Sequence, residues 1–252
     1  MLLCCSMLNS KDGDSPIFPV RMYVTDTKAD EGRIDEWYDL MPPGRRERAG
    51  RFRNEPDRQR CILAYALLVT AVREVDNDIH LNIASSARDS MVRGTLDISE
   101  TAGGKPYLTD IPVCFNISHS KERVAVAVSP GSVGCDVECK NANPLKIAKR
   151  FFTDNEYAFL KGINSEEECL LEFTKLWTLK ESVVKCLGEG IRRPFDDFSL
   201  VDDKGIRYRT IELSGFDRQL HIMEYESERG YCYSLCSVCA DIEDKIRRVE
   251  LK

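Results

Sequence analysis

The apolar residues of this chain recur at intervals that predict both helices and strands. Between Ser165 and Gly188, the residues Leu176, Leu179 and Val183 follow one another at steps of three and four, which is the spacing of one helix face. Ser165 is a suitable N-cap with a glutamate three residues later, as in a capping box, and a glycine suits the position after a helix end. We therefore predict a long amphipathic helix between these two residues.

The remaining sequence alternates between helical and strand-like stretches. A second long helix is predicted at 55–75, where Asn54 can cap the first turn and Pro56 lies within it. Shorter helices are predicted at 36–40, 146–151 and 154–161. Runs rich in β-branched and aromatic residues predict strands at 20–24, 113–117, 123–128, 133–137, 198–201, 219–225 and 231–238. The stretch 79–104 has only weak periodicity, and 242–252 is predicted to be a charged tail.

The order of these elements predicts an α+β fold. A long helix is followed by strands in each half of the chain. We therefore expect two similar subdomains related by a pseudo-two-fold axis, each with a long helix packed on a small antiparallel sheet. We place the subdomains at 16–130 and 131–252, with the junction in the turn-like segment 129–132. Residues 1–15 combine a short apolar start with a polar run and are expected to be disordered.

Charge and hydropathy exclude several classes of protein. The 252 residues carry a net charge of −6, which argues against wholesale nucleic-acid binding. No apolar run approaches the length of about 20 residues that spans a bilayer, and the apolar start lacks the basic residues of a signal peptide. The 11 cysteines are odd in number and scattered, as expected of reduced thiols. We expect a cytoplasmic protein with no membrane or nucleic-acid partner.

Three of the cysteines, Cys232, Cys236 and Cys239, are close enough in sequence to be considered as zinc ligands. No fourth ligand follows at the spacing of a zinc finger. In a strand, Cys232 and Cys236 share one face and Cys239 points to the other. We favour buried thiols over a zinc site, and the sequence assigns the cluster no role.

A local excess of basic residues contrasts with the acidic average. Seven arginines and only three acidic residues lie between Arg45 and Arg60. Such a run is either a solvated helical face or a site for phosphate groups, which guanidinium groups bind through paired hydrogen bonds. The composition alone leaves both interpretations open.

Two acidic residues occupy alternate positions at the strand predicted near 133–137. Asp136 and Glu138 are two apart, so a strand directs both carboxylates to one face. There they either face solvent at a sheet edge or bind a cation such as Mg²⁺, which takes one or two carboxylates together with substrate phosphate oxygens. Glu181 and Lys185 are one helical turn apart and, taken alone, are most simply a solvated ion pair.

The segment 115–120 ends a predicted strand with Ser118 and His119, whose hydroxyl and imidazole can bind an anion. A serine hydrolase is not indicated, because neighbouring residues rarely turn their side chains toward each other and the chain has no Gly-x-Ser-x-Gly motif. The Gly-Gly-Lys-Pro turn at 103–106 places Lys105 where it can reach a phosphate. By itself this turn is a weak signal.

In their order along the chain, these stretches resemble the 4′-phosphopantetheinyl transferases of the two-subdomain type, exemplified by the surfactin-synthetase activator. The motifs that carry the resemblance are Gly-Lys-Pro at 104–106, Asn-x-Ser-His-Ser at 116–120, Gly-x-Asp-x-Glu at 134–138, Phe-Phe-Thr-x-x-Glu at 151–156 and Trp-Thr-x-Lys-Glu-Ser-x-x-Lys at 177–185, followed by Gly188 and Gly190. The resemblance covers residues 40 to 200 or so. Within the motifs only Cys135 departs from the usual aliphatic residue, and a cysteine packs as a comparably small hydrophobe.

The resemblance implies a role for each matching residue. It implies that Asp136, Glu138 and Glu181 bind Mg²⁺ on the pyrophosphate of coenzyme A, with Asp136 also next to the coenzyme itself. It implies catalytic roles for Glu181, Lys185 and Glu156. The residues that it implies for binding coenzyme A are Arg45, Arg48, Arg60, Lys105, Pro106, Ser118, His119, Lys180 and Lys185.

The implied reaction transfers the 4′-phosphopantetheine arm of coenzyme A to a serine hydroxyl of an acyl, peptidyl or aryl carrier protein and releases adenosine 3′,5′-bisphosphate. The implied active site lies at the interface of the subdomains, with the nucleotide end of coenzyme A on the first. Two alternatives are a magnesium-dependent phosphohydrolase acting on coenzyme A or a nucleotide, and a non-catalytic adaptor that binds carrier proteins. A monomer is expected. The sequence does not identify the carrier or its pathway, nor the general base.

Overall fold

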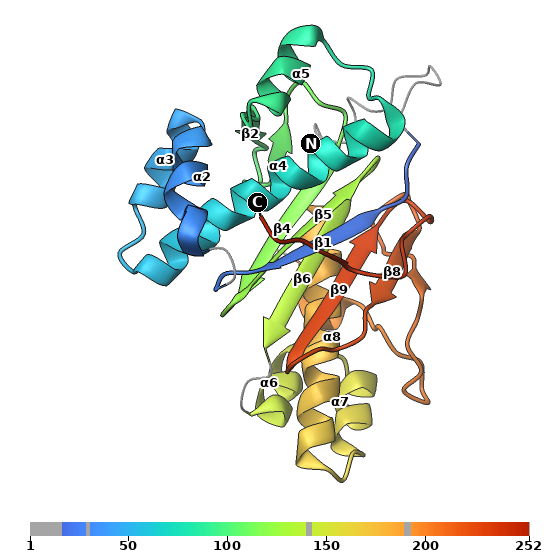
Figure 1. Cartoon of the computed structure of the whole chain (residues 1–252). Coiled ribbons are helices and arrows are strands. Elements are labelled where there is room, and N and C mark those ends of the chain that lie inside the picture. The colour runs from blue at the N-terminus through green and yellow to red at the C-terminus, as the bar shows by residue number, and fades with distance from the viewer. Residues whose placement is uncertain (1–16, 29–30, 140–142, 189–192, 252) are drawn as a thin grey trace.

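The chain folds into two four-stranded sheets, each covered by one long helix, as the computed structural model shows (Figure 1). The structure describes residues 17–28, 31–139, 143–188 and 193–251. The predictions for residues 1–15 and for Gly190 lie outside these ranges. The mixture of helices and antiparallel sheets in the described residues confirms the predicted α+β class. None of the helices in these ranges is long and apolar enough to cross a membrane.

The helices and strands follow one another from a short strand near the N-terminus to a short strand near the C-terminus. The helices are α2 (Ile34–Leu40), α3 (Pro43–Gly50), α4 (Glu55–Ile79), α5 (Ser85–Val92), α6 (Pro144–Phe151), α7 (Asp154–Lys161) and α8 (Glu166–Leu187), with 3-10 helices η1 (Glu31–Arg33) and η3 (Phe195–Asp197). The strands are β1 (Arg21–Asp26), β2 (Ile98–Glu100), β3 (Pro106–Leu108), β4 (Cys114–Ser120), β5 (Arg123–Ser129), β6 (Val133–Cys139), β7 (Thr210–Ile211), β8 (Leu220–Glu224), β9 (Tyr231–Ser237) and β10 (Arg247–Arg248).

The strands form two larger sheets and one small hairpin. The first sheet has the order β10-β1-β5-β4, and the second has the order β6-β9-β8-β7. Neighbouring strands are antiparallel, except that β10 runs parallel to β1. The hairpin pairs β2 with β3.

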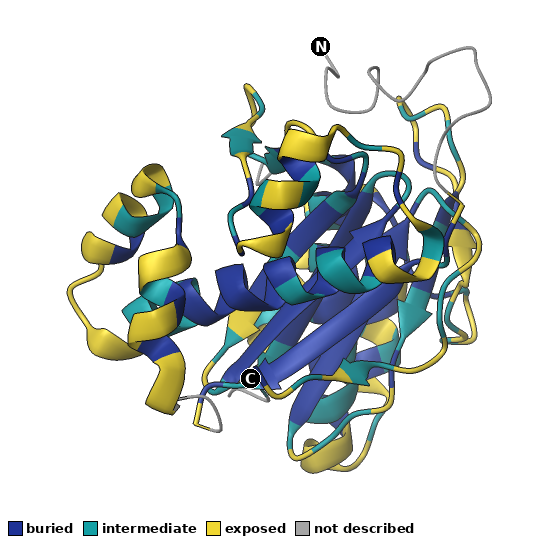
Figure 2. Ribbon diagram, turned by 45° about the horizontal axis from the view of Figure 1, so that its top comes forward, coloured by how far each residue is buried: buried dark blue, intermediate teal, exposed yellow. Residues whose placement is uncertain are grey.

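Alternation along the strands buries both faces of each large sheet. Helix α4 covers one face of the first sheet, where Leu67 and Val124 belong to one hydrophobic core. The opposite face packs on the second sheet through a core that includes Ala125 and Val137. Helix α8 covers the far face of the second sheet, where Val183 belongs to a third core. Because side chains alternate along a strand, one sheet contributes to two cores, and the layers are helix, sheet, sheet, helix. Figure 2 shows the large strands as mostly buried and the outer surfaces of the helices as exposed.

Side-chain caps mark the starts of the two long helices, and a glycine marks the end of α8. Asn54 Oδ1 accepts a hydrogen bond from the amide of Asp57 at the start of α4. At the start of α8, Ser165 Oγ accepts from the amide of Glu168, while the complete capping box belongs to α7. Gly188 ends α8 in the left-handed conformation with φ of 73°, which a glycine adopts without strain.

Several elements differ from the sequence-based predictions. Residues 198–201 form no full strand: Val201 makes only an isolated antiparallel bridge with Arg207, and the Leu200 amide donates its hydrogen bond to the carboxylate of Glu156. Strand β4 continues to Ser120, which pairs with Arg123 at the start of β5. Ser118 and His119 therefore lie within the strand and not in a turn after it. The stretch 79–104, whose periodicity is too weak to predict an element, contains helix α5 and strand β2.

The C-terminal segment packs on the first half of the molecule, although a charged tail was expected. β10 pairs with β1, and Leu251 is only 3% exposed within the core under α4. Arg247 forms ion pairs with Glu74 and Glu243. Val249 and Leu251 lie two positions apart after β10, and both pack on this core although the segment as a whole is charged.

Candidate active site

Gly134 allows helix α8 to lie directly on strand β6. A Cβ atom at this position would lie 2.1 Å from the carbonyl oxygen of Ser182 and 2.4 Å from the amide nitrogen of Cys186. Only glycine leaves this space, so the last turns of α8 lie against the strand. Alternation along β6 then directs Asp136 and Glu138 to the same side as Gly134, toward α8.

Asp136 is buried and lies in a polar network between β4, β6 and α8, to which Ser118 of β4 and Lys185 of α8 belong. Its Oδ1 accepts hydrogen bonds from Lys185 Nζ at 2.6 Å and from Ser118 Oγ at 2.7 Å. Its Oδ2 is buried with no hydrogen-bond partner. An unpaired buried carboxylate oxygen is costly, and such atoms in native proteins commonly mark a place for an ion or another polar group.

Two further carboxylates lie within the electrostatic range of Asp136. Burial raises the pKa of Glu138, and the negative charge of Asp136 raises it further, although Ser120 Oγ donates a hydrogen bond at 2.9 Å. Burial also raises the pKa of Glu181, and the effect of Lys185, which lowers it, does not compensate. Three carboxylates thus repel one another near an ammonium, and a further positive charge placed among them would lower that repulsion.

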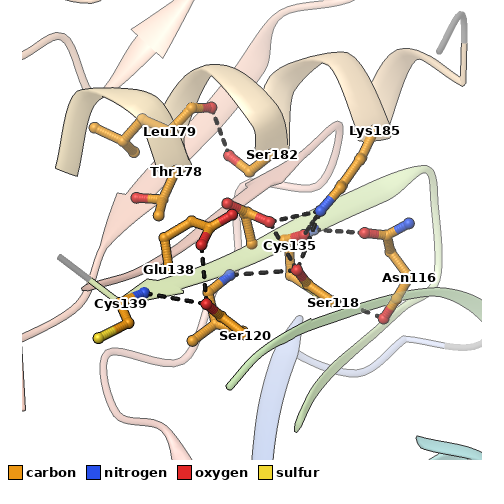
Figure 3. A network of polar contacts seen from close by, with 12 residues as sticks. Asn116, Ser118, Ser120, Cys135, Glu138, Cys139, Thr178, Leu179, Ser182 and Lys185 are labelled. Carbon is orange, nitrogen blue, oxygen red and sulfur yellow. Dashed lines mark hydrogen bonds and ion pairs between the residues drawn. The ribbon is translucent and has the colours of Figure 1, made fainter. Parts of the chain in front are cut away.

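Lys185 carries this ammonium. Burial lowers its pKa, but the charge of Asp136 and the hydrogen bond between them outweigh burial and leave the pKa above its ordinary value. Lys185 also lies 3.2 Å from Ser118 Oγ and 3.3 Å from the Cys135 carbonyl oxygen. Its side chain therefore remains protonated and is held at the centre of the network (Figure 3).

Strand β4 supplies polar side chains from the first half of the chain to β6. Asn116 Oδ1 accepts from the Cys135 amide at 2.9 Å, and the hydroxyls of Ser118 and Ser120 bind the two carboxylates of β6. His119 points to the opposite side of the strand and is exposed. Partial burial of the ring and the charge of Arg60 lower the pKa of His119.

The arginine-rich segment lines a separate pocket. Arg45 and Arg48 of α3, and Arg51 directly after it, border a cavity of about 490 Å³ together with the segment around β2. Burial and the charge of Arg48 lower the pKa of Arg45, while Asp97 and Glu100 also line the pocket and Glu100 pairs with Arg48. Arg60 lies on α4, where it pairs with Asp57 and donates to the Lys121 carbonyl.

No three His, Cys, Asp or Glu side chains in the described ranges stand together as a ready-made metal site. Asp136 is bonded instead to the Lys185 ammonium. Cys232 and Cys236 are buried on one face of β9, as the strand spacing predicts, and Cys239 follows the end of that strand.

Comparison with known proteins decides the family. The family model for the 4′-phosphopantetheinyl transferase superfamily matches residues 132–236. The 4′-phosphopantetheinyl transferase Sfp of Bacillus subtilis (strain 168) is 30% identical over 218 residues, which cover 85% of this chain and 90% of that protein. The chain belongs to the 4′-phosphopantetheinyl transferase family. The corresponding transferase gsp of Aneurinibacillus migulanus is 36% identical over 139 residues, 55% of this chain and 57% of its own. The family resemblance and the enzyme class predicted from the motifs are confirmed.

The transferase does not bring Glu156 and Lys180 into the network around Asp136, although both were expected at the site. Both side chains are 0% exposed, and they form an ion pair of 2.9 Å with each other. Lys180 also donates to the carbonyls of Phe195 and Phe198, and Glu156 accepts from the Leu200 amide. Groups sealed in this way have no surface on which to meet a substrate. Their geometry is that of a structural ion pair.

Lys105 and Pro106 lie at the edge of the first half of the transferase. Lys105 Nζ donates to carbonyl oxygens at the end of α8, including that of Lys185 at 2.8 Å. Pro106 begins β3 and is half-buried. The Lys105 ammonium thus bonds to backbone groups, where the sequence suggested a phosphate ligand.

Two polar residues of the site were present in a motif but received no role from the sequence. Asn116 and Ser120 flank Ser118 at alternate positions of β4, and all three contact β6. The signal that would have found them is the period of two, which places residues 116, 118 and 120 on one face of a strand. The predicted strand at 113–117 stops before Ser118 and Ser120, whereas β4 extends to Ser120.

Proposed function

We propose that this enzyme transfers the 4′-phosphopantetheine arm of coenzyme A to a serine hydroxyl of a carrier protein and releases adenosine 3′,5′-bisphosphate. One observation supports the proposal most directly. Asp136 Oδ2 is buried without a partner, while burial raises the pKa of both Glu138 and Glu181 next to it. This arrangement fits a divalent cation bound together with the pyrophosphate of the donor.

The residues proposed to hold Mg²⁺ are Asp136, Glu138 and Glu181. Carboxylate oxygens are the ligands that this ion prefers, and a cation would relieve their mutual repulsion and pair the orphaned oxygen. When bound, the ion would offset negative charge on the phosphoryl oxygens of coenzyme A.

The side chains of the protein would perform the remaining work. The Lys185 ammonium lies beside Asp136 and would contact the phosphoryl group whose charge grows during transfer. Ser118 and Ser120 hold the carboxylates of β6 in place. A carboxylate of the site, for which Glu181 is proposed, would accept the proton of the attacking serine hydroxyl.

The nucleotide end of coenzyme A would bind on the first half of the chain. The arginine-lined pocket supplies Arg45 and Arg48, and Arg60 and His119 lie near each other on α4 and β4. Guanidinium groups suit phosphate oxygens, and Pro106 would border the base. The proposal leaves out Glu156, Lys180 and Lys105, because their charged groups are bonded within the protein.

We also propose that the site lies where two similar subdomains meet, at 16–130 and 131–252. Each half has a long helix on an antiparallel sheet, in keeping with a pseudo-two-fold relation. Hydrogen bonds from Ser118 to Asp136 and from Ser120 to Glu138 cross the proposed boundary at the site itself. A monomeric, cytoplasmic enzyme is part of the same proposal.

Helix α6 offers a contact for the carrier protein. It follows β6 closely in the chain and carries Lys146, Lys149 and Arg150 beside the exposed apolar side chains of Leu145 and Phe151. Carrier proteins of this class are usually acidic, so a basic helix with an apolar stripe complements them in charge. This contact would bring the acceptor serine toward the carboxylates of β6.

Intact-protein mass spectrometry tests the function. A purified apo carrier protein is incubated with the enzyme, coenzyme A and Mg²⁺, with EDTA in a parallel sample. We expect a gain of one phosphopantetheine mass that EDTA suppresses and that Asp136→Asn abolishes. Calorimetric titration of Mg²⁺ into the enzyme with bound coenzyme A, compared with Asp136→Asn, reports the metal site without turnover.

Other results would point elsewhere. Breakdown of coenzyme A without a carrier would indicate a phosphohydrolase, and carrier binding without any mass gain would indicate an adaptor. Full transfer in EDTA would contradict the magnesium part of the proposal alone.

A further inference from the structure

The Gly-Gly-Lys-Pro turn of the first half packs against the end of helix α8. A Cβ atom on Gly103 would lie 3.0 Å from the carbonyl oxygen of Gly188. A Cβ atom on Gly188 would lie 3.3 Å from Cδ of Lys105. The Lys105 side chain therefore runs along the C-cap of the helix that carries Glu181 and Lys185.

The Lys105 ammonium is surrounded by acceptors of the protein itself. Its Nζ donates to the carbonyl oxygens of Lys185 at 2.8 Å, Val133 at 3.0 Å and Cys186 at 3.1 Å. Ser132 Oγ lies at 3.4 Å. An ammonium has three protons and no lone pair, so these acceptors use its whole donating capacity. No proton remains for a phosphate oxygen unless one of these bonds breaks.

These carbonyls need a donor from outside the helix. The last four carbonyl groups of an α-helix have no partner within it, and here the Gly188 amide supplies only that of Val184. The negative end of the helix dipole also favours a cation at this place. The Lys105 ammonium supplies both a hydrogen-bond donor and a positive charge to the last turn of α8, which contains Lys185.

We propose that Lys105 is a positioning residue for Lys185 and not a ligand of coenzyme A. The Lys105 ammonium holds the backbone of Lys185, and the Lys185 side chain places its own ammonium 2.6 Å from Asp136 Oδ1. The backbone of Lys105 is itself held in place, because the Thr101 amide donates a hydrogen bond of 2.9 Å to the Lys105 carbonyl oxygen and closes the turn. The inference rests on the proposed function, in which Lys185 acts on the transferred phosphoryl group.

Steady-state kinetics with two donors separates positioning from phosphate binding. Lys105→Met is compared with wild type using coenzyme A and 3′-dephospho-coenzyme A, each with the same apo carrier. We expect kcat to fall by about 100-fold with both donors, because small displacements of a catalytic group are this costly. The ratio of kcat/KM for the two donors should stay within about twofold of wild type, because the 3′-phosphate loses no contact. Arg48→Met, in the arginine-lined pocket, is the contrasting variant and is expected to lower that ratio, because it removes a proposed contact of the nucleotide phosphate.

A fall in that ratio for Lys105→Met, or a wild-type kcat, would overturn the proposal. Lys105→Arg covers the case in which the methionine variant folds poorly, because it keeps a cation that can donate to the same carbonyls. It is expected to fold, to recover part of the lost kcat and to leave the donor ratio unchanged, and a lower ratio would again overturn positioning. If wild type itself transfers nothing to any carrier, the proposed function fails first, and that result is distinct from these.

Discussion

At the scale of single residues, the position of a charge decides its role more than its place in a motif. Lys180 and Lys185 lie one turn and a half apart on α8, yet one is sealed in a core and the other reaches Asp136. The helix turns these two side chains to different neighbours, and the burial of each follows from the face on which it lies.

Replacing Lys185 by methionine should lower kcat by about 100- to 1,000-fold, the loss seen when one preorganised donor to a transition state is removed. The measurement is the rate of carrier modification at saturating coenzyme A. Lys175→Met is the control, since this lysine of the same helix forms ion pairs with Glu172 and Glu224. A Lys185→Met enzyme with near-normal kcat would remove Lys185 from the chemistry.

Replacing Glu156 by glutamine should affect stability and not chemistry. It leaves the Lys180 ammonium buried without its counter-charge, and loss of one partner of a buried pair costs about 3–5 kcal/mol of the free energy of unfolding. Urea unfolding gives the stability, and kcat of the folded fraction gives the activity. Glu172→Gln, in a partly exposed pair, should cost about 1 kcal/mol or less. A fully folded Glu156→Gln enzyme without activity would restore Glu156 to the catalytic group.

At the scale of elements, the site depends on the direct contact between α8 and β6. The strand places two carboxylates on one face, and the helix places Glu181 and Lys185 above them. Neither element forms the site alone. The absence of a side chain at Gly134 sets how closely they approach.

Replacing Gly134 by alanine should therefore reduce stability and activity together. The added Cβ meets backbone atoms of α8, and such overpacking costs about 1–3 kcal/mol. The displaced helix should also carry Lys185 away from Asp136 and lower kcat. Gly50→Ala in α3 is the control, because nothing lies within 4 Å of its Cβ, and it should be neutral or stabilising by up to about 1 kcal/mol. Unchanged stability and kcat in Gly134→Ala would show that α8 is not held by this contact.

At the scale of the whole molecule, the two halves share structure and should unfold together. The core between the sheets takes residues from both, and the C-terminal segment of the second half packs on the first through β10 and Leu251. A substitution that destabilises one half should therefore lower the stability of the other half as well.

The two tryptophans of the chain allow a test, because Trp37 lies in the core under α4 and Trp177 packs against the core of α8. In variants that each keep one tryptophan, urea unfolding followed by fluorescence should give a common midpoint. Leu251→Ala should lower the free energy of unfolding by about 2–5 kcal/mol and shift both midpoints equally. Ile206→Ala, at a position that is 61% exposed, should change it by about 0.5 kcal/mol or less. Two separate midpoints would mean that the halves unfold independently.

The sequence by itself determined the elements and the candidate residues of this enzyme. Periods of two and of three to four predicted the long helices and most strands, because local geometry repeats along the chain. The alternation of Asp136 and Glu138 followed in the same way, and the ordered motifs led to the family.

Only the tertiary structure decided which charges are available to a substrate. Burial and pairing depend on residues distant in sequence, such as Glu156 and Lys180, or Lys105 and the last carbonyls of α8. The C-terminal strand β10 was not predicted for the same reason, since its partner β1 lies more than 200 positions earlier. A local pattern carries no information on such partners, because the free energy of a charged group is set by everything that surrounds it in space.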